Sequence, residues 1–186
     1  MNLNLPNSLT WIRIGTIPVF VYCFFSDIEF ARPIAGLLFG FAAITDLLDG
    51  YAARKLKQTS KFGAFLDPVA DKLMVTIALV LLVQVDSRVT VAMIAVVVIG
   101  REITVSALRE WMATVGENAR VAVSWIGKIK TAFQMFGIGF MVYERPLFGI
   151  VIYPIGYWLL IIASVMTLWS MLVYLRAAWP TMHLDA

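Results

Sequence analysis

The segment Asp46–Asp71, DLLDGYAARKLKQTSKFGAFLDPVAD, contains four aspartates, two glycines and four basic residues. It lies in a chain of 186 residues that is 61% hydrophobic, with a mean hydropathy of +0.84. This apolar share is above the roughly 45–50% that is usual for a soluble domain. An ionisable side chain among apolar helices costs free energy unless a partner compensates for its burial. The segment therefore predicts a polar site within a membrane protein.

Apolar runs long enough to cross a bilayer, about 17–25 residues with few charges, recur along the whole chain. They are Leu9–Ser26, Pro33–Ala53, Phe65–Val85, Val89–Ala113, Ile126–Tyr143 and Leu147–Leu175. The polar/apolar alternation of strands is absent, and a helix satisfies its own backbone hydrogen bonds in lipid. We therefore expect an all-α integral membrane protein with six transmembrane helices and a single domain, residues 1–186. No cationic stretch precedes the first run, which predicts a retained span and not a signal peptide.

The charges between these runs predict the orientation of the chain. The turns after the first, third and fifth runs are short and mixed in charge. The segments after the second and fourth runs are basic, with Arg54, Lys55, Lys57 and Lys61 in one and Arg109, Arg120, Lys128 and Lys130 in the other. Basic segments stay on the cytoplasmic side of a membrane. We therefore expect a multi-pass protein of the cytoplasmic (inner) membrane, with both termini and the polar site facing the cytoplasm.

The aspartates form two pairs. Asp46 and Asp49 are three residues apart, and Asp67 and Asp71 are four apart, so each pair lies on one face of a helix. An antiparallel hairpin with a short basic loop brings the two pairs face to face. Pro68 allows two arrangements: a helix that begins there with Asp67 as its cap, or a kink in a helix already formed.

Four carboxylates in a small volume raise one another's pKa unless cations intervene. Oxygen ligands without His or Cys suit Mg²⁺ or Mn²⁺, and two such ions form a clamp for in-line displacement at phosphorus. Gly50 and Gly63 leave room for a ligand near the backbone, and Arg54 is suited to a phosphate oxygen. A divalent-cation transporter is the alternative from another class. Transporters, however, place ion sites near the bilayer midplane between repeats, whereas these aspartates lie near one face and no repeat is visible.

The spacing Asp46-x2-Asp49-Gly50-x2-Ala53-Arg54-x8-Gly63-x3-Asp67-x3-Asp71 resembles the complete signature of the CDP-alcohol phosphotransferases. The resemblance implies that the four aspartates hold two divalent metal ions against the CDP pyrophosphate. It also implies that Asp71 is the general base that deprotonates the acceptor alcohol. The nucleotide pocket would be lined by Gly50, Ala53, Arg54 and Gly63. Members of the family are expected to form homodimers.

Further stretches indicate the acceptor. GREITVSALREW at 100–111 and SWIGKIKTAFQ at 124–134 resemble bacterial phosphatidylglycerophosphate synthases, as do NSLTWIR at 7–13 and LWSM at 168–171. The resemblance covers nearly the whole chain. It implies transfer of the phosphatidyl group from CDP-diacylglycerol to sn-glycerol 3-phosphate, which gives phosphatidylglycerophosphate and CMP. The expected partners are these substrates, membrane lipids and a second copy of the chain, with no nucleic acid.

The basic residues agree with a phosphorylated acceptor. Arg101, Arg109, Lys128 and Lys130 supply cations at the level of the aspartates, with Thr131 as a further donor. A phosphate monoester needs such a cluster, whereas a serine or choline acceptor does not. The alternative explanation, orientation and contact with lipid headgroups, is stronger for Lys128 than for Arg101. Within the family, an acceptor such as serine, inositol or phosphatidylglycerol is the other alternative.

Overall fold

The computed structural model describes residues 5–56, 61–114 and 125–182, with the backbone alone for some residues near helix ends. Its helices are α1 (Leu5–Phe25), α2 (Ala31–Leu56), α3 (Lys61–Val85), α4 (Val89–Thr114), α5 (Trp125–Tyr143) and α6 (Tyr153–Met182). Across these three ranges no strand is present, and the one β-type pairing is an isolated bridge between Leu147 and Ile150. The prediction of an all-helical protein is confirmed for this part of the chain.

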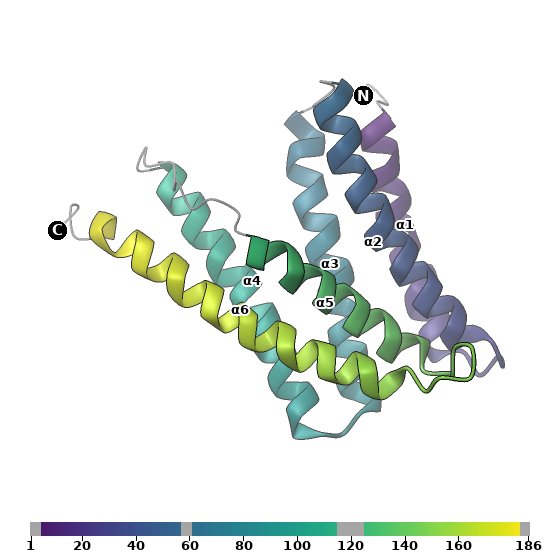
Figure 1. The fold of residues 1–186 in the computed structure, drawn as a ribbon. Coiled ribbons are helices and arrows are strands. Elements are labelled where there is room, and N and C mark those ends of the chain that lie inside the picture. The colour runs from purple at the N-terminus through teal and green to yellow at the C-terminus, as the bar shows by residue number, and fades with distance from the viewer. Residues whose placement is uncertain (1–4, 57–60, 115–124, 183–186) are drawn as a thin grey trace.

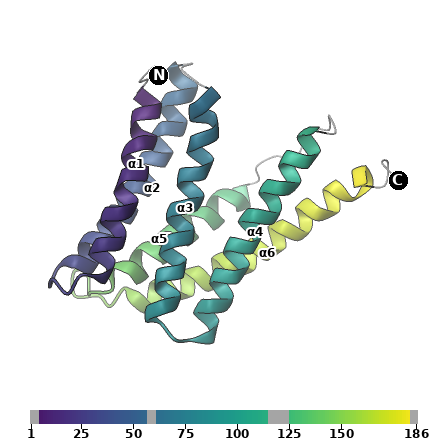
Figure 2. The same ribbon diagram turned by 180° about the vertical axis from the view of Figure 1, so that it is seen from behind.

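The helices form a bundle that is gathered at one end and spread at the other (Figure 1). The helices α1, α2 and α3 run side by side, and α4 and α6 incline away from them toward the end that carries the C-terminus. The helix α5 lies along α6 and also contacts α2 and α3. Seen from behind, α4 and α6 again diverge from α1 and α3 (Figure 2). The turns that join α1 to α2, α3 to α4 and α5 to α6 lie at the gathered end.

Close packing holds α5 against α6. In lipid, helices associate through van der Waals contact and small residues, because lipid tails are as apolar as the side chains. A Cβ atom added to Gly156 would lie 2.7 Å from the carbonyl oxygen of Gly137. One added to Gly36 would lie 2.7 Å from the Cβ of Tyr143, where α2 meets α5. These glycines therefore allow the helix backbones to approach closely.

Polar contacts fasten the gathered end. Arg32, at the start of α2, donates from Nε to Glu144 after α5 over 2.7 Å. The hydroxyl of Tyr153 on α6 donates to Asp86 over 2.6 Å. Arg88 also donates to Asp86, and this hydrogen bond holds the pKa of the Asp86 carboxyl well below its usual range. The turns of the bundle are thus cross-linked by charged side chains.

The outer surface of the bundle is apolar. Val96 and Ile103 on α4 are each 66% exposed, and Trp169 on α6 is 64% exposed. The helical segments Val89–Met112 and Tyr153–Arg176 are long and apolar enough to cross a membrane. Large exposed apolar patches are rare on soluble monomers and mark contact with protein or membrane. These apolar helices indicate a membrane protein.

The last helix begins later than the predicted run at Leu147. Phe148 and Gly149 have φ angles of 50° and 80°. They form a tight turn in which Leu147 and Ile150 exchange backbone hydrogen bonds of 2.9 and 3.0 Å. The helix starts at Tyr153, with Pro154 in its first turn, where the missing N–H has no helical partner to lose. The prediction that this span begins at Leu147 is wrong.

Candidate active site

The four aspartates lie at matching levels of two antiparallel helices. Asp46 is ten residues before the end of α2, and Asp71 is ten residues after the start of α3. At about 1.5 Å per residue, each lies roughly 15 Å from the loop between the helices. Asp49 and Asp67 are seven and six residues from the same helix ends. In the hairpin, the backbone positions of the two aspartate pairs therefore lie at the same depth.

The structure describes the side chain of Asp71 among these four. Asp46, Asp49 and Asp67, and the predicted nucleotide residues Gly50, Ala53, Arg54 and Gly63, have backbone positions in α2 or α3, but their side chains lie outside the described part. Pro68 is the eighth residue of α3, so the helix begins before it. The alternative in which Asp67 caps this helix is therefore wrong.

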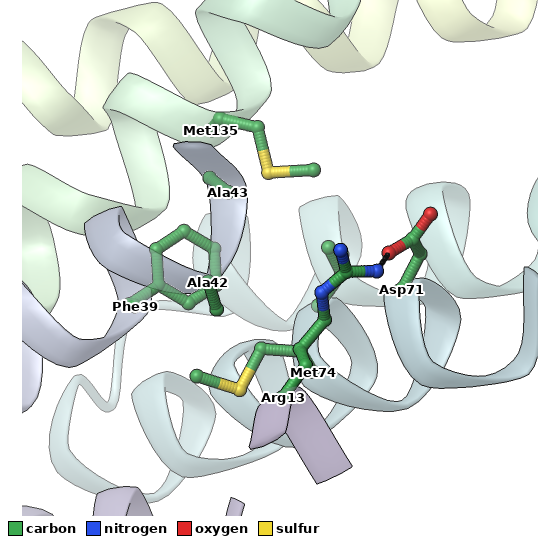
Figure 3. Close-up of a pocket in the computed structure, with 8 residues that line it drawn as sticks. Arg13, Phe39, Ala42, Ala43, Asp71, Met74 and Met135 are labelled. Carbon is green, nitrogen blue, oxygen red and sulfur yellow. Dashed lines mark hydrogen bonds and ion pairs between the residues drawn. The ribbon is translucent and has the colours of Figure 1, made fainter. Parts of the chain in front are cut away.

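Asp71 lines an open hollow of about 250 Å³ between four helices (Figure 3). The lining residues are Arg13 from α1, Phe39, Ala42 and Ala43 from α2, Asp71, Met74 and Val75 from α3, and Met135 from α5. Of these, Arg13 and Asp71 are charged and the other six are apolar. The hollow therefore combines one ion pair with apolar side chains.

The ion pair in the hollow joins α1 to α3. Arg13 is 2% exposed, and its Nη1 atom donates to Oδ1 of Asp71. Figure 3 shows the guanidinium reaching the carboxylate from α1. Arg13 was not among the predicted site residues, although a cation within an apolar run marks a functional candidate.

Lys72, the residue after Asp71, connects α3 to α4. Its Nζ atom donates to Oγ of Ser106, and the Ser106 hydroxyl donates to the carbonyl oxygen of Glu102 over 2.6 Å. This link holds α4 beside the level of Asp71. Neither Lys72 nor Ser106 was among the predicted site residues. The sequence shows that Lys72 is a cation beside a predicted catalytic residue. It does not show how α4 is aligned with α3, which brings Ser106 to Lys72.

The predicted acceptor-binding residues of α5 lie on different faces of the helix. Lys130 is 4% exposed, while Lys128 and Thr131 are on the exposed surface. The Thr131 hydroxyl donates to the carbonyl oxygen of Gly127 over 3.0 Å, within the same helix. Residues two apart on a helix do not share a face, whereas residues four apart do. Lys130 accordingly shares the buried face with Gln134, and Lys128 does not.

On α4, Arg101 is partly buried beside a carboxylate. Its Nη1 atom lies 2.5 Å from Oε1 of Glu102, and its side chain is 12% exposed. Its Nε atom is buried and has no hydrogen-bond partner among the described residues. A buried donor without an acceptor costs about 1–3 kcal/mol, so this atom is suited to an incoming anion. Arg109 lies eight residues further along α4, with its side chain outside the described part.

Comparison with known proteins identifies the family. Residues 3–169 match the sequence model of the CDP-alcohol phosphatidyltransferases. The chain belongs to this family. A Pseudomonas fluorescens protein is 48% identical over 185 residues, which cover 98% of this chain and 94% of the relative. Proteins of Pectobacterium atrosepticum and Haemophilus influenzae are each 48% identical over 178 residues, which cover 96% of this chain and 96% and 95% of the relatives.

All three relatives carry the name CDP-diacylglycerol–glycerol-3-phosphate 3-phosphatidyltransferase. The predicted family is thereby confirmed. CDP-alcohol phosphatidyltransferases use divalent metal ions, and the residues present fit such ions. The hairpin holds four carboxylate-bearing residues at two matching levels, and oxygen donors are what Mg²⁺ and Mn²⁺ prefer.

Proposed function

We propose that this CDP-alcohol phosphatidyltransferase transfers the phosphatidyl group of CDP-diacylglycerol to sn-glycerol 3-phosphate, giving phosphatidylglycerophosphate and CMP. The observation that carries the proposal is the 48% identity, over nearly the full length of both chains, to relatives named for this reaction. Family membership also favours a transferase over the cation transporter considered from the sequence. The membrane-facing surface and the charged hollow are consistent with a lipid donor and a water-soluble acceptor.

Asp71 would act as the general base. Its side chain is 33% exposed and lines the hollow, so a hydroxyl group can reach it. It would take the proton of the acceptor hydroxyl, whose oxygen attacks the β-phosphorus of the donor and displaces CMP. A positioned base typically contributes about 10²–10⁴-fold to a rate. Two Mg²⁺ or Mn²⁺ ions held by Asp46, Asp49, Asp67 and Asp71 would neutralise charge on the pyrophosphate when bound.

Separate groups would bind the two polar parts of the substrates. The CDP moiety would lie against Gly50, Ala53, Arg54 and Gly63. The phosphate of glycerol 3-phosphate would be held by a set of residues on α4 and α5, which are Arg101, Arg109, Lys128, Lys130 and Thr131. Within this set, the burial of Lys130 and the unpartnered Nε atom of Arg101 favour these two residues. The diacyl tails would lie between helices that are open to the bilayer.

We further propose that all six helices cross the cytoplasmic membrane. They contain 19 to 30 residues, which corresponds to about 28–45 Å at 1.5 Å per residue. The hydrocarbon core of a bilayer is about 30 Å thick. The basic segments after α2 and α4 support an orientation in which the site and both termini would lie on the cytoplasmic side. The proposal treats residues 1–186 as one domain and includes a homodimer, which the family resemblance implies.

An acceptor panel tests the function. Purified protein in detergent, given CDP-diacylglycerol and Mg²⁺, should release CMP with glycerol 3-phosphate and far less with serine, inositol or phosphatidylglycerol. Excess EDTA should abolish the release, and Mg²⁺ or Mn²⁺ should restore it. A preference for serine or inositol would overturn the acceptor while leaving the family intact. Full activity in EDTA would contradict the metal-dependent mechanism.

A further inference from the structure

We propose that Arg13 is a positioning residue, which fixes the carboxylate of Asp71 in the orientation that the transfer reaction needs. This inference rests on the proposed function, in which Asp71 is the base. It starts from the ion pair between Nη1 of Arg13 and Oδ1 of Asp71. The two residues are 58 positions apart in the sequence, so the contact is made by the packing of α1 against α3.

The two partners differ in their accessibility. The side chain of Arg13 is 1% exposed, whereas that of Asp71 is 33% exposed. Both residues line the hollow, but a substrate there would meet more of the Asp71 carboxylate than of the guanidinium. Removing a guanidinium from water costs several kcal/mol unless a well-placed anion compensates. Arg13 would consequently act on the reaction through Asp71 and not by direct contact with a substrate.

The pair also distinguishes the two carboxylate oxygens. Arg13 engages Oδ1, and in Figure 3 the second oxygen of Asp71 points away from the guanidinium. A carboxylate on a helix can rotate about its side-chain torsions, and only some orientations direct an oxygen to a given point. By holding Oδ1, Arg13 selects orientations in which Oδ2 is directed away from α1. That oxygen would then receive the proton or contribute to metal binding.

Arginine suits this task better than lysine. Its guanidinium is planar and stays protonated in apolar surroundings. It therefore cannot lose a proton and act as a base in place of Asp71. Other residues that line the hollow, such as Phe39, Met74 and Val75, are apolar, and the guanidinium is buried. A purely structural tie between α1 and α3 would use the same contact, but it would affect folding and not the chemical step.

The test compares variants of the full chain, purified in detergent, by CMP release with glycerol 3-phosphate. The variants are R13M, R13K, D71N and the double variant R13M/D71N. R32M is the matched control, because Arg32 also pairs with a carboxylate, Glu144, but at the gathered end. Thermal unfolding reports folding. Mn²⁺ binding, followed by electron paramagnetic resonance, gives a readout that does not depend on turnover.

Residues that orient a catalytic or metal-binding group typically affect function by about 10–100-fold. We expect R13M to lower kcat by about this factor, with KM for either substrate changed by less than about threefold. Mn²⁺ binding should weaken in R13M as it does in D71N, and R32M should match the wild type in both measurements. Adding R13M to D71N should cause no further loss, because residues that act as a unit are not additive.

The proposal would be overturned if R13M kept the wild-type kcat or the wild-type Mn²⁺ affinity. It would also be overturned if the losses of the two single variants multiplied in R13M/D71N. A loss confined to KM for CDP-diacylglycerol would overturn it as well, because it would make Arg13 a donor-binding residue. Should R13M fail to fold, R13K carries the test: it should fold and still lose about tenfold in kcat, and wild-type kcat there also overturns the proposal. If the wild type releases no CMP, the proposed function itself fails.

Discussion

Polar side chains are buried on several helices in the part of the chain that the structure describes. They are Thr10 and Arg13 on α1, Thr45 on α2, Lys130 and Gln134 on α5, and Ser164 and Thr167 on α6. Burying a polar group costs free energy unless it is hydrogen-bonded, and a buried charge also needs a compensating partner. Packing alone would place apolar residues at these positions. Among them, Arg13 is paired with Asp71, and we propose that the buried Lys130 holds a charged substrate.

The pair Lys128 and Lys130 provides a matched test of this role. K130A should raise the KM for glycerol 3-phosphate by about 10–100-fold, since a hydrogen bond to a charged group contributes about 1.5–3 kcal/mol. The exposed Lys128 lies on another face of α5, so K128A should change KM by less than about threefold. Initial rates of CMP release measure both. Equal effects would indicate that headgroup contact or orientation explains these cations.

Sequence spacing could predict that these cations lie at the level of the aspartates, but not which of them faces the interior of the bundle. Lys128 and Lys130 both lie near the start of the same apolar run, Ile126–Tyr143, and the resemblance included both in one motif. Which of them faces the bundle depends on the rotation of α5 against its neighbours, and tertiary contacts fix that rotation. The aspartates were more predictable, because spacings of three and four residues determine a shared helix face whatever the rotation.

Asp86 predicts a pH dependence of stability. Because the hydrogen bond from Arg88 lowers the pKa of folded Asp86, the carboxylate stabilises the fold above the unfolded value of about 3.9. This contribution is lost as the pH falls through the lower, folded value. D86N should therefore unfold at a lower temperature than the wild type at pH 7, and the difference should shrink in strong acid. A difference that grows on acidification would contradict this assignment.

At the scale of helices, the positions of five apolar runs were predictable and the start of the sixth was not. The third run, Phe65–Val85, ends with α3 at the same residue, and the fifth, Ile126–Tyr143, lies within α5. The error at Leu147 arose because its neighbours are apolar, and hydropathy does not report backbone geometry. The turn depends on positive φ at Phe148 and Gly149, which a bulky residue such as Phe seldom adopts.

The crossing of α5 and α6 yields a prediction at this scale. G156A would place a methyl group 2.7 Å from the carbonyl oxygen of Gly137, and overpacking of this kind costs about 1–3 kcal/mol. G40A is the control, because no atom lies within 4 Å of the added group. Thermal unfolding should show a lower midpoint for G156A and an unchanged or higher one for G40A. Equal midpoints would show that α6 shifts without cost.

At the scale of the whole molecule, the bundle has two different ends. One end is fastened by Arg32 with Glu144 and by Tyr153 with Asp86. At the other, α4 and α6 diverge from α1 to α3. The helix α4 contains 26 residues, or about 39 Å at 1.5 Å per residue, so it is long enough to carry the chain from one end to the other. The proposed orientation assigns the spread end to the cytoplasm.

Labelling of single cysteines tests this orientation. Ser87 precedes α4, Thr114 is its last residue, and both are exposed. C23S removes the native thiol. In intact cells, a membrane-impermeant maleimide should label S87C but not T114C, because the basic segment after α4 stays inside. Inverted membrane vesicles should give the reverse result. Labelling of T114C in intact cells would place the aspartates outside and would exclude cytoplasmic access for glycerol 3-phosphate.

The spread end has a consequence for the fate of the lipid product. Because α4 and α6 diverge from α1 to α3 at the end that the proposed orientation assigns to the cytoplasm, donor and product would exchange sideways with the inner leaflet, without either lipid leaving the bilayer. At the opposite end, polar contacts of the described turns hold the helices together. In this arrangement the enzyme makes its product in the monolayer that supplied the donor and never flips it. Delivery to the opposite monolayer would then require a separate lipid-translocating protein.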